Sequence, residues 1–236
     1  MSRQIEKLSV FLPAYNEEAS LKNTVKNVVE NLEKNVSEWE LIIVNDGSRD
    51  KTGEIADNLS HQDKNISVIH HHPNRGYGAA LKSGLYACRY PWISFIDSDG
   101  QFDFSEISRL LVTQAETDAD LVIGYYLSRK VSLSRKINTF AWQIFVKILF
   151  GLSVRDIDCG FKLISKKVLE KIEPLQSERG AFISSEFLIK AQKAGFKIVE
   201  IGVNHFPRRQ GEGTGANMDV IIQSFVDLFR LWYKLK

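Results

Sequence analysis

Two acidic residues, Asp97 and Asp99, have the type and spacing that suit chemistry best in this sequence. They follow the apolar run WISFI, and Gly100 permits a turn that brings both carboxylates to one side of the chain. Hard oxygen ligands of this kind suit Mg²⁺ or Mn²⁺, which keep positions open for substrate phosphates, and Gln101 can add a carbonyl oxygen. Turns rich in Asp and Gly are also common in loops, so the segment alone leaves both interpretations open.

Two further polar clusters follow apolar runs nearer the N-terminus. Asp46, in the run IIVNDGS, can accept a hydrogen bond from a nucleobase N–H, or it can form an Asx turn into the next helix. Tyr15, Asn16 and Glu17 come directly after Pro13 and Ala14. They either begin a helix or contact a ribose and base.

A glycine-containing segment at residues 74–78, NRGYG, precedes an expected helix. Its backbone N–H groups could approach a phosphate there. The segment has neither the GxGxxG spacing of dinucleotide-binding folds nor the lysine of a P-loop. The sequence therefore argues against a dehydrogenase and against a P-loop enzyme.

Short apolar runs alternate with helical patterns through the first half of the chain. Strands are predicted at residues 8–12, 41–44, 66–69, 92–96 and 121–123, and helices at 18–32, 52–59, 78–87 and 105–115. This alternation predicts an α/β fold with a mostly parallel sheet covered by helices on both faces. Because such sheets bind ligands at the carboxyl ends of their strands, the three polar clusters are predicted to share one pocket.

The second half of the chain is less regular. Residues 137–149 are apolar on nearly all sides, a helix fits 185–194, a strand fits 197–203, and 208–217 have the composition of a loop. An amphipathic helix is predicted at 218–235. No shift in composition marks a boundary, so one domain is expected over 1–236, with a nucleotide-binding half at 8–124, an acceptor-binding half at 125–217 and a C-terminal helix at 218–236.

Composition and charge narrow the class of protein. The 31 basic and 29 acidic residues give a net charge of +2, which does not favour a nucleic-acid partner. Two cysteines do not make a disulfide framework and are expected to be reduced thiols in the cytoplasm. The most apolar stretch, residues 140–152, is shorter than the roughly 20 residues that span a bilayer. The oligomeric state is left open.

Six segments follow one another along the chain: PAYNEE (13–18), VNDGS (44–48), NRGYGAALKSG (74–84), DSDGQ (97–101), DIDCGFK (156–162) and the loop containing Arg208. Taken in this order, they resemble the family 2 glycosyltransferases of the GT-A fold, and in particular the polyprenyl-phosphate sugar transferases of the dolichyl-phosphate mannose synthase type. The resemblance covers about residues 8 to 211. The loop after Arg208 departs from the family pattern, because Gly213-Thr214-Gly215-Ala216 stand where a Ser-Lys pair is frequent. The QxxRW motif of processive synthases is also missing.

This resemblance implies a role for individual positions. Asp99, Asp158 and Arg208 would be catalytic, with Asp158 facing the sugar and the reacting phosphate. The nucleoside would be lined by Pro13, Tyr15, Glu17, Asp46, Asp97 and Ser98. The metal would be held by Asp97, Asp99 and Gln101, and the acceptor or donor phosphates would be met by Arg129, Arg135 and Arg208.

The activity implied is inverting, metal-dependent transfer of a hexose from a UDP- or GDP-sugar to a polyprenyl phosphate. Such an acceptor requires contact with the cytosolic surface of a membrane, for which the apolar residues 137–149 and the final helix are candidates; both could equally pack on the sheet. Three alternatives remain: a glycan or small-molecule acceptor, a catalytically silent nucleotide-sugar-binding protein, and a nucleotidyltransferase. The last would normally have a glycine-rich loop after the first strand, where Tyr15-Asn16-Glu17 stand.

Overall fold

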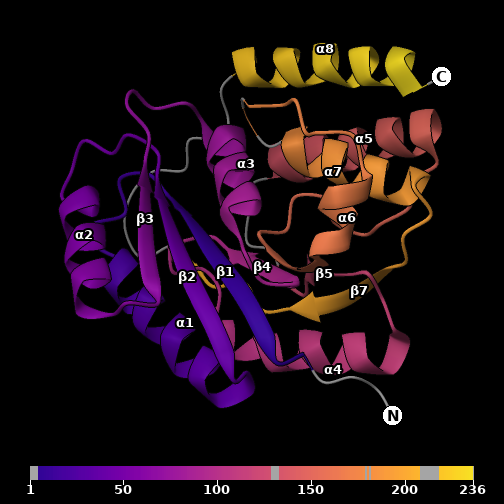
Figure 1. The fold of residues 1–236 in the computed structure, drawn as a ribbon. Helices are drawn as coiled ribbons and strands as arrows, with labels where there is room; N and C mark the ends of the chain where they lie inside the picture. Colours follow the sequence, from indigo (N-terminus) through magenta and orange to yellow (C-terminus); the bar gives the residue numbers. More distant parts are fainter. Residues whose placement is uncertain (1–4, 129–132, 179, 181, 208–217, 236) are drawn as a thin grey trace.

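The computed structural model describes residues 5–128, 133–178, 180, 182–207 and 218–235, and in these ranges seven strands form one sheet (Figure 1). The strands are β1 (Lys7–Ala14), β2 (Glu38–Asn45), β3 (Ile66–His70), β4 (Trp92–Ile96), β5 (Leu121–Tyr126), β6 (Phe161–Ser165) and β7 (Ile198–Val203). The helices are α1 (Leu21–Asn35), α2 (Thr52–Gln62), α3 (Tyr77–Ala87), the 3₁₀ turn η1 (Phe104–Glu106), α4 (Ile107–Thr117), α5 (Leu133–Phe150), α6 (Lys166–Lys171), α7 (Phe182–Lys193) and α8 (Met218–Leu235).

The strand order is β3-β2-β1-β4-β6-β5-β7, and the sheet is mostly parallel as the sequence predicts. β1 lies between β2 and β4 and is parallel to both, so its side chains are buried on both faces from Leu8 to Ala14. β6 is antiparallel to both β4 and β5, and the sequence pattern did not predict this strand. Its five residues, FKLIS, follow an acidic segment and include a lysine.

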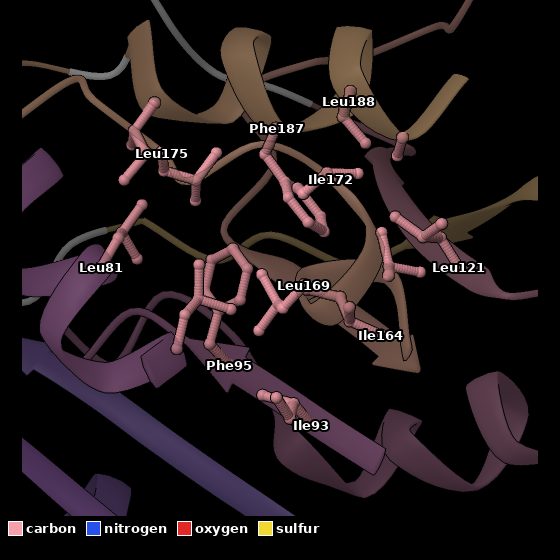
Figure 2. Close-up of a cluster of buried hydrophobic side chains, with 14 of the residues drawn as sticks. Leu81, Ile93, Phe95, Leu121, Ile164, Leu169, Ile172, Leu175, Phe187 and Leu188 are labelled. Atoms are coloured by element: carbon pink, nitrogen blue, oxygen red, sulfur yellow. The ribbon is translucent and has the colours of Figure 1, made fainter. Parts of the chain in front are cut away.

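Helices cover both faces of the sheet, and each face has its own apolar core. On one face, α1 buries Leu21, Val25, Val28 and Leu32, which recur at helical spacing, and packs with α2 and α4. On the other face, α3, α6 and α7 pack against the sheet, with α5 and α8 outside them (Figure 1). Figure 2 shows this second core, in which Phe95 of β4 lies among side chains of α3, α6 and α7.

The C-terminal segment is a helix as predicted, and it lies over α7 and beside α5 (Figure 1). Its Leu228 and Leu231 are buried, while Phe229 and Tyr233 are exposed. Among the described residues, no helix combines the length and the apolar character needed to cross a lipid bilayer.

Candidate active site

The carboxyl ends of β1, β2 and β4 meet at one edge of the sheet, because these three strands are parallel neighbours. Ser98, after β4, donates its hydroxyl to the carbonyl of Pro13 in β1 at 2.6 Å. Asn16, after β1, donates its backbone N–H to Ser48 at 3.0 Å and accepts from the backbone N–H of Arg49 at 2.8 Å. The three predicted polar clusters therefore come together.

Asp97 occupies a niche directly after β4. Its Oδ1 accepts a hydrogen bond of 2.9 Å from the hydroxyl of Tyr77. On the other side lies the backbone of Gly160, where a Cβ atom would come within 2.6 Å of Asp97 Cγ. Burial, followed by the charge of Asp99, raises the pKa of Asp97 to about 7. Near neutral pH this carboxyl is therefore divided between its neutral and its charged form.

Asp99 and Gln101 belong to the same turn. The carboxylate of Asp99 accepts from the backbone N–H of Gln101 at 3.0 Å. Gln101 also holds the segment after β7, because its side-chain amide donates to the carbonyl of Phe206 at 2.9 Å and its own carbonyl accepts from the N–H of Phe206 at 2.8 Å. The acidic turn is thus joined to the chain that leads towards residue 208.

An aromatic cluster supports this junction. The ring of His205 packs edge-on against Tyr126 and Phe102, with centroid distances of 4.6 Å and 5.2 Å. Phe102 in turn packs edge-on against Phe161 of β6. These contacts fix the end of β7 against the acidic turn.

Asp46 is buried, and its carboxylate accepts hydrogen bonds from other residues of the chain. Both oxygens accept two hydrogen bonds each, which fills the capacity of a carboxylate. A nucleobase that contacts Asp46, as expected from the sequence, would have to replace one of these donors, and this contact stays a prediction. The four donors are His71 Nδ1 at 2.6 Å and Arg75 N at 3.0 Å on Oδ1, and Asn74 Nδ2 and Gly76 N at 2.8 Å each on Oδ2.

The same contacts change the interpretation of residues 74–78. The backbone N–H groups of Arg75 and Gly76, which the sequence offered to a phosphate, point at Asp46 instead. The physical reason is that a carboxylate at the start of α3 satisfies N–H groups that have no partner within the helix. Asp46 therefore fixes a loop beside the pocket.

Glu17 and Tyr15 lie near the end of β1. Glu17 is buried, its N–H donates to Thr52 at 2.7 Å, and its carboxylate accepts from Ser20 at 2.8 Å. Its charge also contributes to the raised pKa of Asp97, which shows that the two carboxylates are close. Tyr15 is partly buried, whereas Pro13 is buried.

The segment 156–162 lies beside Asp97, because its Gly160 is packed against that carboxylate. Asp158 donates its backbone N–H to Asp156 at 2.9 Å. The pKa of Tyr77 is raised well above its usual value by burial and then by the charges of Asp97, Tyr126 and Asp158, so Asp158 lies near the same hydroxyl. Burial raises the pKa of the Cys159 thiol to about 12, which agrees with a packing role rather than a nucleophilic one.

Three residues of this site went unrecognised in the sequence. Tyr77 and Gly160 shape the Asp97 niche, and Lys162 is fully buried beneath it, with its ammonium donating to the carbonyl of Cys159 and lying 5.3 Å from the centroid of the Phe95 ring. The charge of Lys162 opposes the rise in the pKa of Asp97. All three lie in segments that resemble the family, 74–84 and 156–162, but their residue types alone did not indicate a place beside Asp97.

The structure describes no side chain of the three expected arginines. Arg129 and Arg208 lie outside the described residues, and of Arg135 only the helical backbone in α5 is described.

The acidic pair fits a divalent cation of the Mg²⁺ type. In the described part of the chain, no three His, Cys, Asp or Glu side chains are grouped as a metal site of their own. Mg²⁺ and similar hard cations are commonly bound by one or two carboxylates, with substrate phosphates and water completing the shell. Two close carboxylates at an open strand end meet that requirement.

The fold is the GT-A type of glycosyltransferase, and the comparison with protein families gives the same class. Residues 9–173 match the model of glycosyl transferase family 2, and the chain belongs to this family. Among solved structures, glucosyl-3-phosphoglycerate synthase from Mycobacterium tuberculosis, in complex with Mn²⁺, UDP-glucose and phosphoglyceric acid, has the same fold. It superposes with a TM-score of 0.73 at 21% identity, over 96% of this chain and 80% of that one.

Curated relatives share more of the sequence. Glycosyltransferase AglD of Haloferax volcanii is 31% identical over 97% of this chain and 37% of its own length. A dolichyl-phosphate beta-glucosyltransferase of Dictyostelium discoideum is 32% identical over 84% and 65%. An undecaprenyl-phosphate 4-deoxy-4-formamido-L-arabinose transferase of Photorhabdus laumondii is 32% identical over 98% and 67%. The chain thus spans only part of the first two relatives.

Proposed function

We propose that this protein transfers a hexose from a UDP- or GDP-sugar to a polyprenyl phosphate, with inversion at the anomeric carbon and with Mg²⁺ or Mn²⁺. The observation that carries the proposal is the pair Asp97 and Asp99 at the carboxyl end of β4, hydrogen-bonded through Ser98 to the end of β1. The names of the curated relatives support a lipid-phosphate acceptor, and the Mn²⁺ complex of the structural neighbour supports a divalent metal.

In this mechanism Asp97, Asp99 and the side-chain carbonyl oxygen of Gln101 would hold the cation. A bound cation would stabilise the negative charge that grows on the departing nucleoside diphosphate. Pro13, Tyr15, Glu17 and Ser98 line the nucleoside, and Asp46 holds the neighbouring loop 71–76 in place. The acidic pair and the nucleoside wall together orient the donor.

The reacting bond joins the anomeric carbon to the donor phosphate. An oxygen of the acceptor phosphate attacks this carbon from the opposite side, the sugar–phosphate bond breaks, and its electron pair leaves with the diphosphate. A phosphate oxygen is already anionic, so no strong base is needed, and Asp158 acts by positioning the sugar. Arg129, Arg135 and Arg208 pair with phosphate oxygens, for which the planar guanidinium is suited.

A transfer assay with labelled UDP-glucose and GDP-mannose, a polyprenyl phosphate and Mn²⁺ tests this proposal. We expect label in the organic phase with one of the two donors, loss of transfer on addition of EDTA, and its return with excess Mn²⁺. Transfer that continues unchanged in EDTA would overturn the metal assignment. Transfer only to a soluble glycan or small molecule would overturn the lipid acceptor.

A lipid acceptor requires contact with a membrane, and the proposed contact is an outer apolar surface on α5 and α8, facing the cytosolic side. The two helices are joined by the ring of Phe225, which packs edge-on against Trp142 and Phe145. Exposed basic side chains at Lys147 and Arg230 add attraction to anionic lipids. The exposed apolar residues of this surface are Phe140, Ile144, Phe145, Ile148, Val226, Phe229 and Tyr233.

Replacing Ile148 with aspartate should weaken binding to anionic vesicles about 30-fold. Ile148 is 75% exposed, and burying such a side chain in lipid contributes about 2 kcal/mol, which a carboxylate forfeits. Flotation with phosphatidylglycerol vesicles measures the effect. The matched control is Val112→Asp on α4, a 55% exposed residue on the other face of the sheet, which should bind as wild type does. Equal losses in both variants would contradict this surface.

A further inference from the structure

The hydroxyl of Tyr77 is a hydrogen-bond partner of Asp97. Tyr77 is the first residue of α3, twenty positions before Asp97 in the sequence, and donates to Asp97 Oδ1 at 2.9 Å. The ring of Tyr77 is partly buried against the core formed by α3, α6 and α7. Its position, however, decides how the carboxylate is turned.

The carboxylate of Asp97 is held from two sides. Tyr77 fixes Oδ1, and Gly160 lies against Oδ2 so closely that a Cβ atom there would overlap this oxygen and lie 2.6 Å from Cγ. Together, these two contacts restrict rotation of the carboxylate about its Cβ–Cγ bond. Its remaining acceptor positions therefore point in a fixed direction.

The helix start that bears Tyr77 is itself held firmly. The N–H of Gly76 donates to Asp46 at 2.8 Å, and the N–H of Ala79 donates to the carbonyl of Glu178 at 2.8 Å. Gly78 packs so closely on the backbone of Glu178 that a Cβ atom would lie 2.8 Å from its carbonyl. Tyr77 cannot shift away from Asp97 without breaking these contacts.

We propose that Tyr77 is a positioning residue, whose hydroxyl turns the Asp97 carboxylate towards the divalent cation of the bound donor. The proposal rests on the proposed function, because it presumes that Asp97 meets a cation. Hydrogen bonds from such outer partners orient metal-binding carboxylates, and their loss typically weakens metal affinity 10- to 100-fold. Asp46 and Asp97 are thereby held by one short segment, residues 74–79.

Tyr77→Phe tests the proposal, because it removes the hydroxyl and keeps the ring. Titration calorimetry with MnCl₂, in the presence of whichever of UDP and GDP the wild type binds more tightly, should give a 10- to 100-fold weaker Mn²⁺ affinity. In turnover assays the Mn²⁺ concentration for half-maximal rate should rise by a similar factor, with the rate at saturating Mn²⁺ less affected. The melting temperature should fall by about 2–4 °C, as for loss of one hydrogen bond.

The matched control is Tyr86→Phe on the same helix. Its hydroxyl accepts from the backbone N–H of Leu175 at 3.1 Å, far along α3 from the acidic turn. This variant should show a similar fall in melting temperature with unchanged Mn²⁺ affinity. A merely structural role for Tyr77 would make the two variants behave alike.

A second variant approaches Asp97 from the other side. Gly160→Ala forces a Cβ atom against the carboxylate and should also weaken Mn²⁺ binding, even if Tyr77→Phe does not fold. Wild-type Mn²⁺ affinity in either folded variant would overturn this inference alone. A wild-type protein that binds no Mn²⁺ with either nucleotide would overturn the proposed function as well.

Discussion

Replacing Asp97 with asparagine should make the nucleotide-free protein more stable while removing its metal-dependent activity. The carboxyl is partly buried beside Asp99, and burial and that charge raise its pKa to about 7. Asparagine has nearly the same shape, can still accept from Tyr77, and carries no charge. The variant thus keeps the niche intact and removes the charge repulsion within it.

The sign of the pH dependence follows from the raised pKa. In the unfolded chain Asp97 loses its proton near its ordinary pKa of 3.8, whereas in the folded protein it keeps the proton until about pH 7. The wild type therefore loses stability as the pH rises from about 4 to 7, and asparagine does not. Because one pKa unit corresponds to 1.36 kcal/mol, the advantage of the variant in unfolding free energy should grow by about 2–3 kcal/mol between pH 5 and pH 8.

Urea unfolding of the two proteins at both pH values, without metal or nucleotide, measures this difference. Adding Mn²⁺ and nucleotide should stabilise the wild type and leave Asp97→Asn unaffected, because we expect only the wild type to bind the ion. A variant that is less stable than wild type at pH 8 would contradict the prediction.

Asp103→Asn is a control with the opposite sign. Burial alone would raise the pKa of Asp103, but hydrogen bonds from Ser105 and Asn27 prevail and lower it. Its charge therefore stabilises the fold above the ordinary pKa of 3.8, and its removal should give no gain in stability at pH 8. The two variants separate a carboxylate that is part of a site from one that supports the fold.

Replacing Asp99 with alanine should reduce turnover at least 100-fold and leave the fold intact. Asp99 shares the acidic turn with Asp97, and its carboxylate accepts a hydrogen bond from the backbone N–H of Gln101 at 3.0 Å. Loss of one group that stabilises charge in a transition state commonly costs about 100- to 1000-fold in rate. The measurement is sugar transfer at saturating donor over a range of Mn²⁺ concentrations, with circular dichroism as the test of folding.

The control for this variant is Asp57→Ala. Asp57 lies on α2 with its carboxylate half exposed, and it contacts His70 at 3.0 Å at the edge strand of the sheet. Its removal should leave turnover unchanged. Full activity of Asp99→Ala in Mg²⁺-supplemented assays would rule out Asp99 as a metal-holding residue, whatever the acceptor proves to be.

Local patterns in the sequence were enough for the framework of the fold. The spacing of Leu21, Val25, Val28 and Leu32 predicts the helix that buries exactly one face in the structure, since burial of a helix face imposes this period. The apolar runs before Asp46 and Asp97 predict β2 and β4, and their parallel arrangement brings both acids to one edge. The place of the acidic turn 97–101 followed from the same logic, because residue type and strand end are both visible locally; its role in metal binding stays a prediction.

The antiparallel strand β6 escaped prediction because its neighbours decide it. Phe161–Ser165 is short and contains Lys162, so neither its period nor its composition distinguishes it from a loop. Only its insertion between β4 and β5 makes it a strand. That insertion also carries Gly160 beneath Asp97.

By itself, then, the sequence determined the alternation of strands and helices, the acidic turn after β4 and the family of the protein. Tertiary structure alone decided which groups those acids contact. Asp46 faces the start of α3, Asp97 faces Tyr77 and Gly160, and Gln101 holds Phe206 across 105 positions. The physical reason is that periodicity records which side of an element is buried, whereas a hydrogen bond between distant segments exists only once the chain has brought them together.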